Sequence, residues 1–296
     1  MPPLMVDLGG VSVVALIGTV VAFVTFGIVL KLAAIRQLPP TPVAFTNYVL
    51  AAVVTGGMAL AAPETLGGPP VWILGGLAGA AFVTGFYINY RAIDQVGLAI
   101  AQPVASVAVI LPILASVVFW GERPSLPQTM AILVACLALL LLGSATGSEE
   151  PAPSSVSRGG GAWRILLALF LVQGAVMLAP KALEEWGYGA YRWGYLAALF
   201  TVASVGSGLR WASSRERLTP LGAGLGVVFG TANVAATVLL LASLAALPGI
   251  IVYPVTSVGS MVLAGLVGVT VWSERPGRRA LAGMALAVPS VLLLNL

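Results

Sequence analysis

Amide and phenol side chains stand inside long apolar stretches of this sequence, where a polar group needs a specific partner. A polar side chain that faced an apolar medium would lose its hydrogen bonds, so such groups normally point into a helix bundle or a wet cavity. The residues predicted to contact a ligand are Tyr87, Asn89, Gln102, Asn233, Tyr253, Asn47 and Tyr195. Hydrogen bonding between helices explains any single one equally well, and tyrosines near the end of a stretch could instead anchor at a membrane surface.

Two lysines, Lys31 and Lys181, lie within a turn or two of the end of an apolar stretch. One interpretation is that their long side chains reach out to lipid headgroups. A second is that they attract a carboxylate or phosphate at the mouth of a cavity, and on that basis both join the predicted binding site. A third is a structural ion pair with Glu184 or Asp94.

The composition excludes several kinds of catalytic chemistry. The sequence has no histidine, and its single cysteine, Cys136, lies inside an apolar run. No Asp or Glu falls in the middle of an apolar stretch. We therefore predict no catalytic residues, no metal site, no cofactor and no enzyme activity. Because carriers of lipophilic cations usually need a buried carboxylate, a neutral, zwitterionic or anionic ligand is favoured.

The overall composition is that of an integral membrane protein. Charged residues make up only 8% of the chain, against about 25% in a typical soluble domain, and the mean hydropathy is +1.03. The net charge of +4 comes from arginines near loops and indicates no nucleic-acid partner. Spans of about 20 apolar residues suit membrane helices. The ten predicted spans are 10–33, 41–62, 71–93, 97–120, 126–145, 163–181, 190–213, 220–243, 248–272 and 278–295.

The chain contains an internal repeat. Trp120-Gly121-Glu122-Arg123-Pro124 is followed 152 residues later by Trp272-Ser273-Glu274-Arg275-Pro276. Each copy stands between the fourth and fifth spans of its half. A half with five spans must lie inverted in the membrane relative to the other half, which is an arrangement found in secondary transporters.

The repeat divides the chain into two units and a joint. We predict a first repeat at 1–145, a polar linker at 146–162 rich in Pro, Ser and Gly, and a second repeat at 163–296. Pro103 and Pro254 occupy equivalent positions in the fourth and ninth spans. A proline inside a helix removes one backbone hydrogen bond and bends the axis. These two prolines are the predicted hinges, although static kinks are equally plausible.

The segments Val29-Leu30-Lys31-Leu32-Ala33-Ala34 and Phe119-Trp120-Gly121-Glu122-Arg123-Pro124 resemble the EamA repeat of the drug/metabolite transporter superfamily. The resemblance implies an all-α membrane protein of ten helices in two inverted five-helix repeats. It also implies a central cavity lined by spans 1–4 and 6–9, with spans 5 and 10 at the periphery or at a dimer contact. Relatives export amino acids and other metabolites, and some import them.

The predicted function is transport of a small organic metabolite, an amino acid or related compound, by alternating access in the export direction. The expected partners are the lipid bilayer and a small-molecule substrate, and the protein is expected to be a monomer or a homodimer. Efflux of drugs or dyes is the alternative. An intramembrane enzyme lacks a catalytic constellation, and a channel would need rings of charge or a carbonyl filter.

The distribution of basic residues predicts the orientation in an inner, or plasma, membrane. Cytoplasmic loops carry an excess of Lys and Arg. Ten arginines fall on one side of the predicted spans, whereas Arg123, Arg192 and Lys181 fall on the other. This count places both termini outside the cell. Many members of the family that the sequence resembles have both termini inside the cell, so the charge count and the resemblance indicate opposite orientations.

Overall fold

A computed structural model of the chain describes residues 10–96, 98–145, 162–272 and 277–293. Within these ranges the secondary structure is α-helical, with two 3-10 turns, η1 (Pro63–Thr65) and η2 (Gly189–Tyr191), and no β-strand. Among the described residues, six helices are long and apolar enough to cross a membrane. The all-α prediction is confirmed. The predicted linker lies outside the described residues except for Ala162.

Each of the ten predicted spans is a helix, with ends that differ from the prediction by a few residues. The first half contains α1 (Gly10–Ile35), α2 (Pro40–Ala61), α3 (Pro69–Val96), α4 (Leu98–Val107), α5 (Ile110–Val118) and α6 (Leu126–Ala145). The second half contains α7 (Ala162–Glu185), α8 (Arg192–Ala212), α9 (Pro220–Ala246), α10 (Gly249–Trp272) and α11 (Arg278–Leu293).

The fourth span consists of two helices, α4 and α5, because its hydrogen bonds are interrupted before Pro112. Proline has no N–H to donate to the carbonyl of Ala108, four residues earlier. That carbonyl accepts instead from the N–H of Leu111 at 3.0 Å, in a tighter turn. The predicted hinge Pro103 lies inside α4, and its counterpart Pro254 lies inside α10, which continues without a break.

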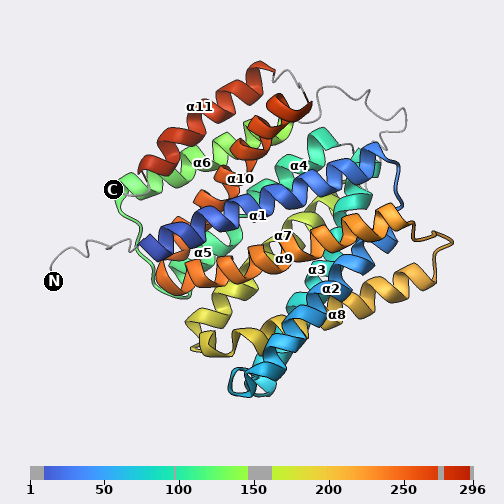
Figure 1. Cartoon of the computed structure of the whole chain (residues 1–296). Helices are drawn as coiled ribbons and strands as arrows, with labels where there is room; N and C mark the ends of the chain where they lie inside the picture. Colours follow the sequence, from blue (N-terminus) through green and yellow to red (C-terminus); the bar gives the residue numbers. More distant parts are fainter. Residues whose placement is uncertain (1–9, 97, 146–161, 273–276, 294–296) are drawn as a thin grey trace.

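The packing of the helices has the symmetry expected of an inverted repeat. The second span of each half packs against its counterpart, α2 on α8, and the fifth spans do the same, α6 on α11. Two equivalent helices can contact each other in this way when an axis of twofold symmetry passes between them. Figure 1 shows α6 and α11 together at one edge of the bundle, where the resemblance places the fifth and tenth spans.

Glycines allow α3 and α8 to pack with their backbones close together. A Cβ atom added to Gly79 would lie 2.2 Å from the carbonyl oxygen of Leu199, and one added to Gly75 would lie 2.5 Å from that of Tyr195. Any larger side chain at either position would therefore collide with the backbone of α8. These small residues hold α3 and α8 together as a closely packed pair.

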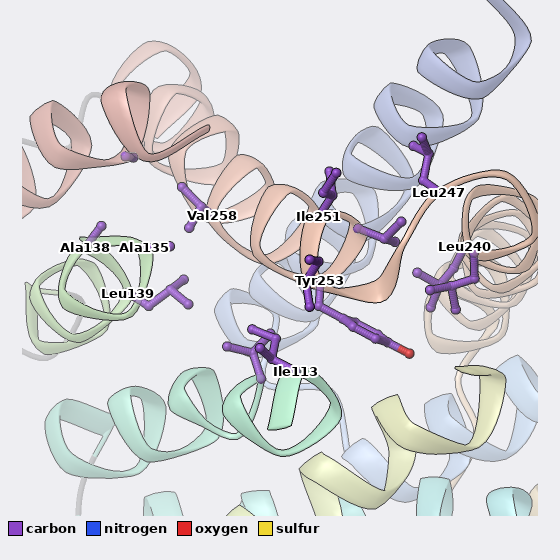
Figure 2. Packing of buried hydrophobic residues seen from close by; sticks show 14 residues of the cluster. Ile113, Ala135, Ala138, Leu139, Leu240, Leu247, Ile251, Tyr253 and Val258 are labelled. Atoms are coloured by element: carbon purple, nitrogen blue, oxygen red, sulfur yellow. The ribbon is translucent and has the colours of Figure 1, made fainter. Parts of the chain in front are cut away.

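Two clusters of buried apolar side chains form most of the interior. One gathers residues of α2, α3, α8 and α9, including Tyr48, Tyr195 and Phe200. The other gathers residues of α5, α6, α9, α10 and α11 around Tyr253 (Figure 2). Many large apolar side chains on the outer faces of the helices remain exposed, among them Leu60, Leu77 and Leu126. Such a surface suits a hydrocarbon environment.

Candidate functional site

A carboxylate from the first half of the chain binds the start of a helix in the second half. Glu122 stands in the loop between α5 and α6. Its Oε1 accepts hydrogen bonds from Lys181 Nζ at 2.5 Å and from the Gly249 N–H at 2.9 Å. Its Oε2 accepts from the Ile250 N–H at 3.0 Å. Glu122 therefore satisfies two of the backbone donors that the N-terminus of α10 leaves unpaired, and it neutralises a lysine.

The local sequence turns Glu122 back toward the bundle. Gly121 has φ +68°, a left-handed conformation that glycine adopts without steric cost. Directly after it, the Glu122 N–H donates to the carbonyl of Ser116 at 3.0 Å. Glu122 thus caps α10, which begins more than a hundred residues later in the chain.

Lys181 lies near the end of α7 and is only 1% exposed. Its ammonium group forms ion pairs with Glu122 and with Glu185, one turn later on the same helix. The ring of Trp120 is also close, with its centroid 5.9 Å from Nζ. Of the three interpretations of this lysine, the structural ion pair fits the geometry. Its partners are Glu122 and Glu185 rather than the expected Glu184 or Asp94.

The side chain of Tyr253 links α10 to α7 close to this cluster. Tyr253 is 1% exposed, and its hydroxyl donates to the carbonyl oxygen of Met177 at 2.6 Å. In Figure 2 the hydroxyl oxygen points away from the apolar cluster, toward the yellow ribbon of α7. The phenol of Tyr253, one of the predicted binding residues, therefore joins α10 to α7 in this conformation.

The second copy of the repeated motif contacts the other lysine at the opposite end of the bundle. Lys31 Nζ lies 4.4 Å from the ring centroid of Trp272, which begins that copy. The remaining residues of the motif, 273–276, lie outside the described residues. In each half, therefore, the tryptophan of the motif meets the lysine of the other half. We call the two ends of the bundle the Lys31 end and the Lys181 end.

Two predicted amides bind each other in the middle of the bundle. Asn233 Nδ2 on α9 donates to Asn47 Oδ1 on α2 at 3.2 Å, and the two residues are 6% and 1% exposed. When the halves are aligned on Tyr48 and Tyr195, the residues that match Asn47 and Asn233 are Gly194 and Phe86. The pair is therefore a polar feature that breaks the symmetry between the halves.

Several buried polar atoms have no hydrogen-bond partner within the described part of the chain. They are Tyr87 Oη, Asn89 Oδ1, Ser116 Oγ, Tyr195 Oη and Ser257 Oγ. Three of these residues, Tyr87, Asn89 and Tyr195, belong to the predicted site. A buried polar group without a partner loses about 1–3 kcal/mol of free energy, so each of these atoms is suited to receive a ligand or water. The backbone of Gln102 lies in α4, and its side chain lies outside what the structure describes.

Residues at the Lys31 end form a second group of polar contacts. The Glu216 carboxylate accepts from the Thr41 N–H at 3.2 Å, at the start of α2. The Arg210 guanidinium lies 5.9 Å from the ring centroid of the predicted site residue Tyr87. The sequence alone did not indicate Glu122, Ser116 or Arg210 as site residues. The only available signal was the repetition of the motif around Glu122.

Two apolar grooves lie on the outer surface of the bundle. A groove of about 560 Å³ runs between α1 and α9, and one of about 330 Å³ runs between α3 and α8. Both are lined by apolar residues, glycine and threonine, several of them exposed. Neither is lined by any of the predicted binding residues.

Comparison with known proteins identifies the class of protein. Residues 10–144 match the model of the EamA-like transporter family, which covers the first predicted repeat and confirms the resemblance. The first half of the chain therefore belongs to the EamA-like transporter family of the drug/metabolite transporter superfamily, and this match supports a multi-pass membrane transporter.

The fold has counterparts among solved structures. One of them, described only as "Crystal structure of protein", superposes with a TM-score of 0.70, and the match covers 95% of this chain and 95% of that one. At 16% sequence identity this similarity shows the fold alone. No curated protein matches the sequence.

Proposed function

We propose that the protein exports a small organic metabolite, an amino acid or a related compound, by alternating access between its two inverted halves. One observation carries this proposal. The Glu122 carboxylate of the first half binds both Lys181 and the N-terminus of α10 in the second half, and so ties the halves together at one end. A contact of this kind acts as a gate when it can form and break.

The arrangement of the repeat supports a second gate. Trp272 and Lys31 occupy the Lys31 end in the same relation that Trp120 and Lys181 have at the Lys181 end. In an inverted-repeat transporter, the closing of one end accompanies the opening of the other. We propose that the two ends of the bundle open alternately, with the Glu122 contact as the gate at the Lys181 end. On this basis the repeats extend over 1–145 and 163–296.

The candidate substrate contacts lie between the two ends. Asn47 and Asn233 supply amide groups near the middle of α2 and α9, and Tyr87, Asn89 and Tyr195 supply buried groups without partners among the described residues. We propose that these residues, with Tyr253, Gln102 and the two lysines, surround the substrate during the transport cycle. Pro103 and Pro254 are the proposed hinges.

The orientation follows from the exposed arginines. Arg36, Arg91 and Arg210 are exposed at the Lys31 end, and the short loop after α8 adds Arg215 and Arg217. By the positive-inside rule, this end faces the cytoplasm of a cell whose inner membrane holds the protein. The Glu122 gate then faces outward and is closed in this structure, as required of an exporter that awaits its substrate.

Counterflow in proteoliposomes tests the proposal. Purified protein is reconstituted, loaded with an unlabelled amino acid chosen by a thermal-shift screen, and supplied with the labelled compound outside. A carrier should show trans-stimulated uptake, in which internal substrate accelerates entry of the label. An ohmic current without trans-stimulation would indicate a channel instead, and the absence of both across the library would contradict transport of this substrate class.

A further inference from the structure

The Glu122 carboxylate occupies what is chemically a complete anion-binding site. The donors around it are the ammonium group of Lys181 and the N–H groups of Gly249 and Ile250, at 2.5, 2.9 and 3.0 Å. A helix N-terminus with a nearby cation is suited to bind carboxylates, and transporters use such ends for the acidic groups of their substrates. In this conformation the anion is a side chain of the protein itself.

A second observation shows that the site has a donor that Glu122 does not use. Ser116 is 0% exposed, and its Oγ has no hydrogen-bond partner among the residues that the structure describes. A Cβ atom added to Gly249 would lie 2.6 Å from Ser116 Oγ and 3.1 Å from Lys181 Cε, so both side chains converge on the first residue of α10. The buried hydroxyl is therefore aimed at the site and is free to donate to a bound anion.

We propose that Lys181, Ser116 and the N-terminus of α10 form the binding site for a carboxylate group of the transported substrate, and that Glu122 occupies this site as an internal substitute when the gate is closed. This inference rests on the proposed transport function and adds to it the chemical class of the substrate. The substrate is a zwitterion or an anion that carries a free carboxylate.

The geometry favours a carboxylate over other anions. The two oxygens of Glu122 divide three donors between them, with Oε1 taking Lys181 and Gly249 and Oε2 taking Ile250. A substrate carboxylate reproduces this planar two-oxygen arrangement. The charge also balances, because one carboxylate replaces another while Lys181 keeps its ion pair with Glu185.

Replacement of the Glu122 carboxylate by a substrate carboxylate couples substrate binding to the opening of the gate. When a substrate carboxylate takes the donors, Glu122 leaves and the loop between α5 and α6 loses its hold on α10. Without substrate, opening would leave Lys181 and two helix N–H groups without Glu122, which is unfavourable inside an apolar bundle. The ligand thus binds the open state more tightly than the closed one, which is the condition for a ligand to shift an equilibrium.

Chemical rescue with acetate tests the inference. The variant Glu122→Ala removes the internal carboxylate and leaves the donors in place, so its melting temperature should fall relative to the parent protein. Acetate should then raise it, by about 3–6 °C at ten times the Kd of acetate. Acetamide, which has nearly the same shape but no charge, should not. The double variant Glu122→Ala/Lys181→Met should lose the rescue, and Glu122→Ala/Ser116→Ala should need more acetate for it.

A second variant keeps the test decisive if Glu122→Ala does not fold. Glu122→Gln preserves the volume of the side chain but lacks its charge, and acetate should stabilise it more than it stabilises the parent protein. If acetate and acetamide act alike on both variants, the proposed site is wrong. Counterflow by the parent protein separates this outcome from a failure of transport. Counterflow without acetate rescue would refute only the carboxylate site, whereas rescue without counterflow of any carboxylate would refute the substrate assignment.

Discussion

At the scale of single residues, two polar contacts join the two halves of the chain. Asn47 and Asn233 bind each other across α2 and α9, and Glu122 binds Lys181 from a distant loop. Polar groups that face hydrocarbon have no water to compensate a lost bond. These contacts therefore stabilise the protein and favour one arrangement of its two halves.

A double-mutant cycle measures the interaction energy between Asn47 and Asn233. Asn47→Ala and Asn233→Ala should each destabilise the protein by about 1–2 kcal/mol, because each leaves the other amide buried without its partner. The double variant should lose less than the sum, with a coupling energy of about 0.6–1.7 kcal/mol. Reversible unfolding in mixed micelles with SDS provides the measurement. The exposed Thr231, two residues from Asn233, is the control, and Thr231→Ala should be additive with Asn47→Ala.

At the scale of elements, the distance between two helices depends on which positions lack a side chain. Gly75 and Gly79 face the backbone of α8. Gly76 lies on the same helix, and an added Cβ there would meet only the side chain of Val202, at an ordinary contact distance of 3.7 Å. The same substitution should therefore have opposite effects at neighbouring positions.

The expected result is that Gly79→Ala destabilises the protein by about 1–3 kcal/mol, because its Cβ would collide with the Leu199 carbonyl. Gly76→Ala should be neutral or stabilise the protein by up to about 1 kcal/mol, since alanine favours the helix over glycine. Thermal unfolding in detergent compares the two variants. Equal losses of stability would show that α3 and α8 do not pack as described.

The break between α4 and α5 makes a second prediction at this scale. Position 112 is proline, whereas the equivalent position in α10 is Leu263, and α10 is continuous. Pro112→Leu restores an N–H for the Ala108 carbonyl, so amide hydrogen exchange around residues 108–112 should slow. Leu263→Pro should open α10 at the matching place and destabilise the protein by about 3 kcal/mol. Unchanged exchange in the first variant would mean that neighbouring helices cause the break.

At the scale of the whole molecule, inversion places the two copies of one motif at opposite ends of the bundle. The proposed Glu122 gate lies at the Lys181 end, and most of the exposed arginines lie at the Lys31 end. By the positive-inside rule, we expect the Lys31 end to face the cytoplasm. Because the helices alternate in direction, the beginning of α1 and the end of α11 both lie at the Lys181 end.

Labelling of introduced cysteines determines the orientation. In a Cys136→Ala background, Glu64→Cys and Ser213→Cys place thiols at exposed positions near the Lys181 end and the Lys31 end. A membrane-impermeant maleimide should label position 64 in intact cells and position 213 only after permeabilisation. The reverse pattern would place both termini in the cytoplasm, as in the family habit, and would turn the Glu122 gate inward.

The sequence predicted the fold well because its signals are local and repeated. Runs of about 20 apolar residues define spans wherever they occur, and the predicted spans are helical, with the fourth divided into α4 and α5. The site was predicted less well. Asn47 and Asn233 were correctly expected to face the interior, but their mutual contact depends on how α2 crosses α9. The break before Pro112 was not predicted, because proline in a helix can bend it without ending it.

By itself the sequence determined the all-α class and the resemblance to the EamA family, and it predicted ten spans and an inverted repeat, because each follows from composition and from order along one chain. Only the tertiary structure decided what Glu122 and Lys181 do. Glu122 of the first half meets Lys181, Gly249 and Ile250 of the second half, and no spacing along the chain encodes that meeting. The repeated motif marked the place, and the packing of one half on the other brought Glu122 to Lys181 and to the start of α10.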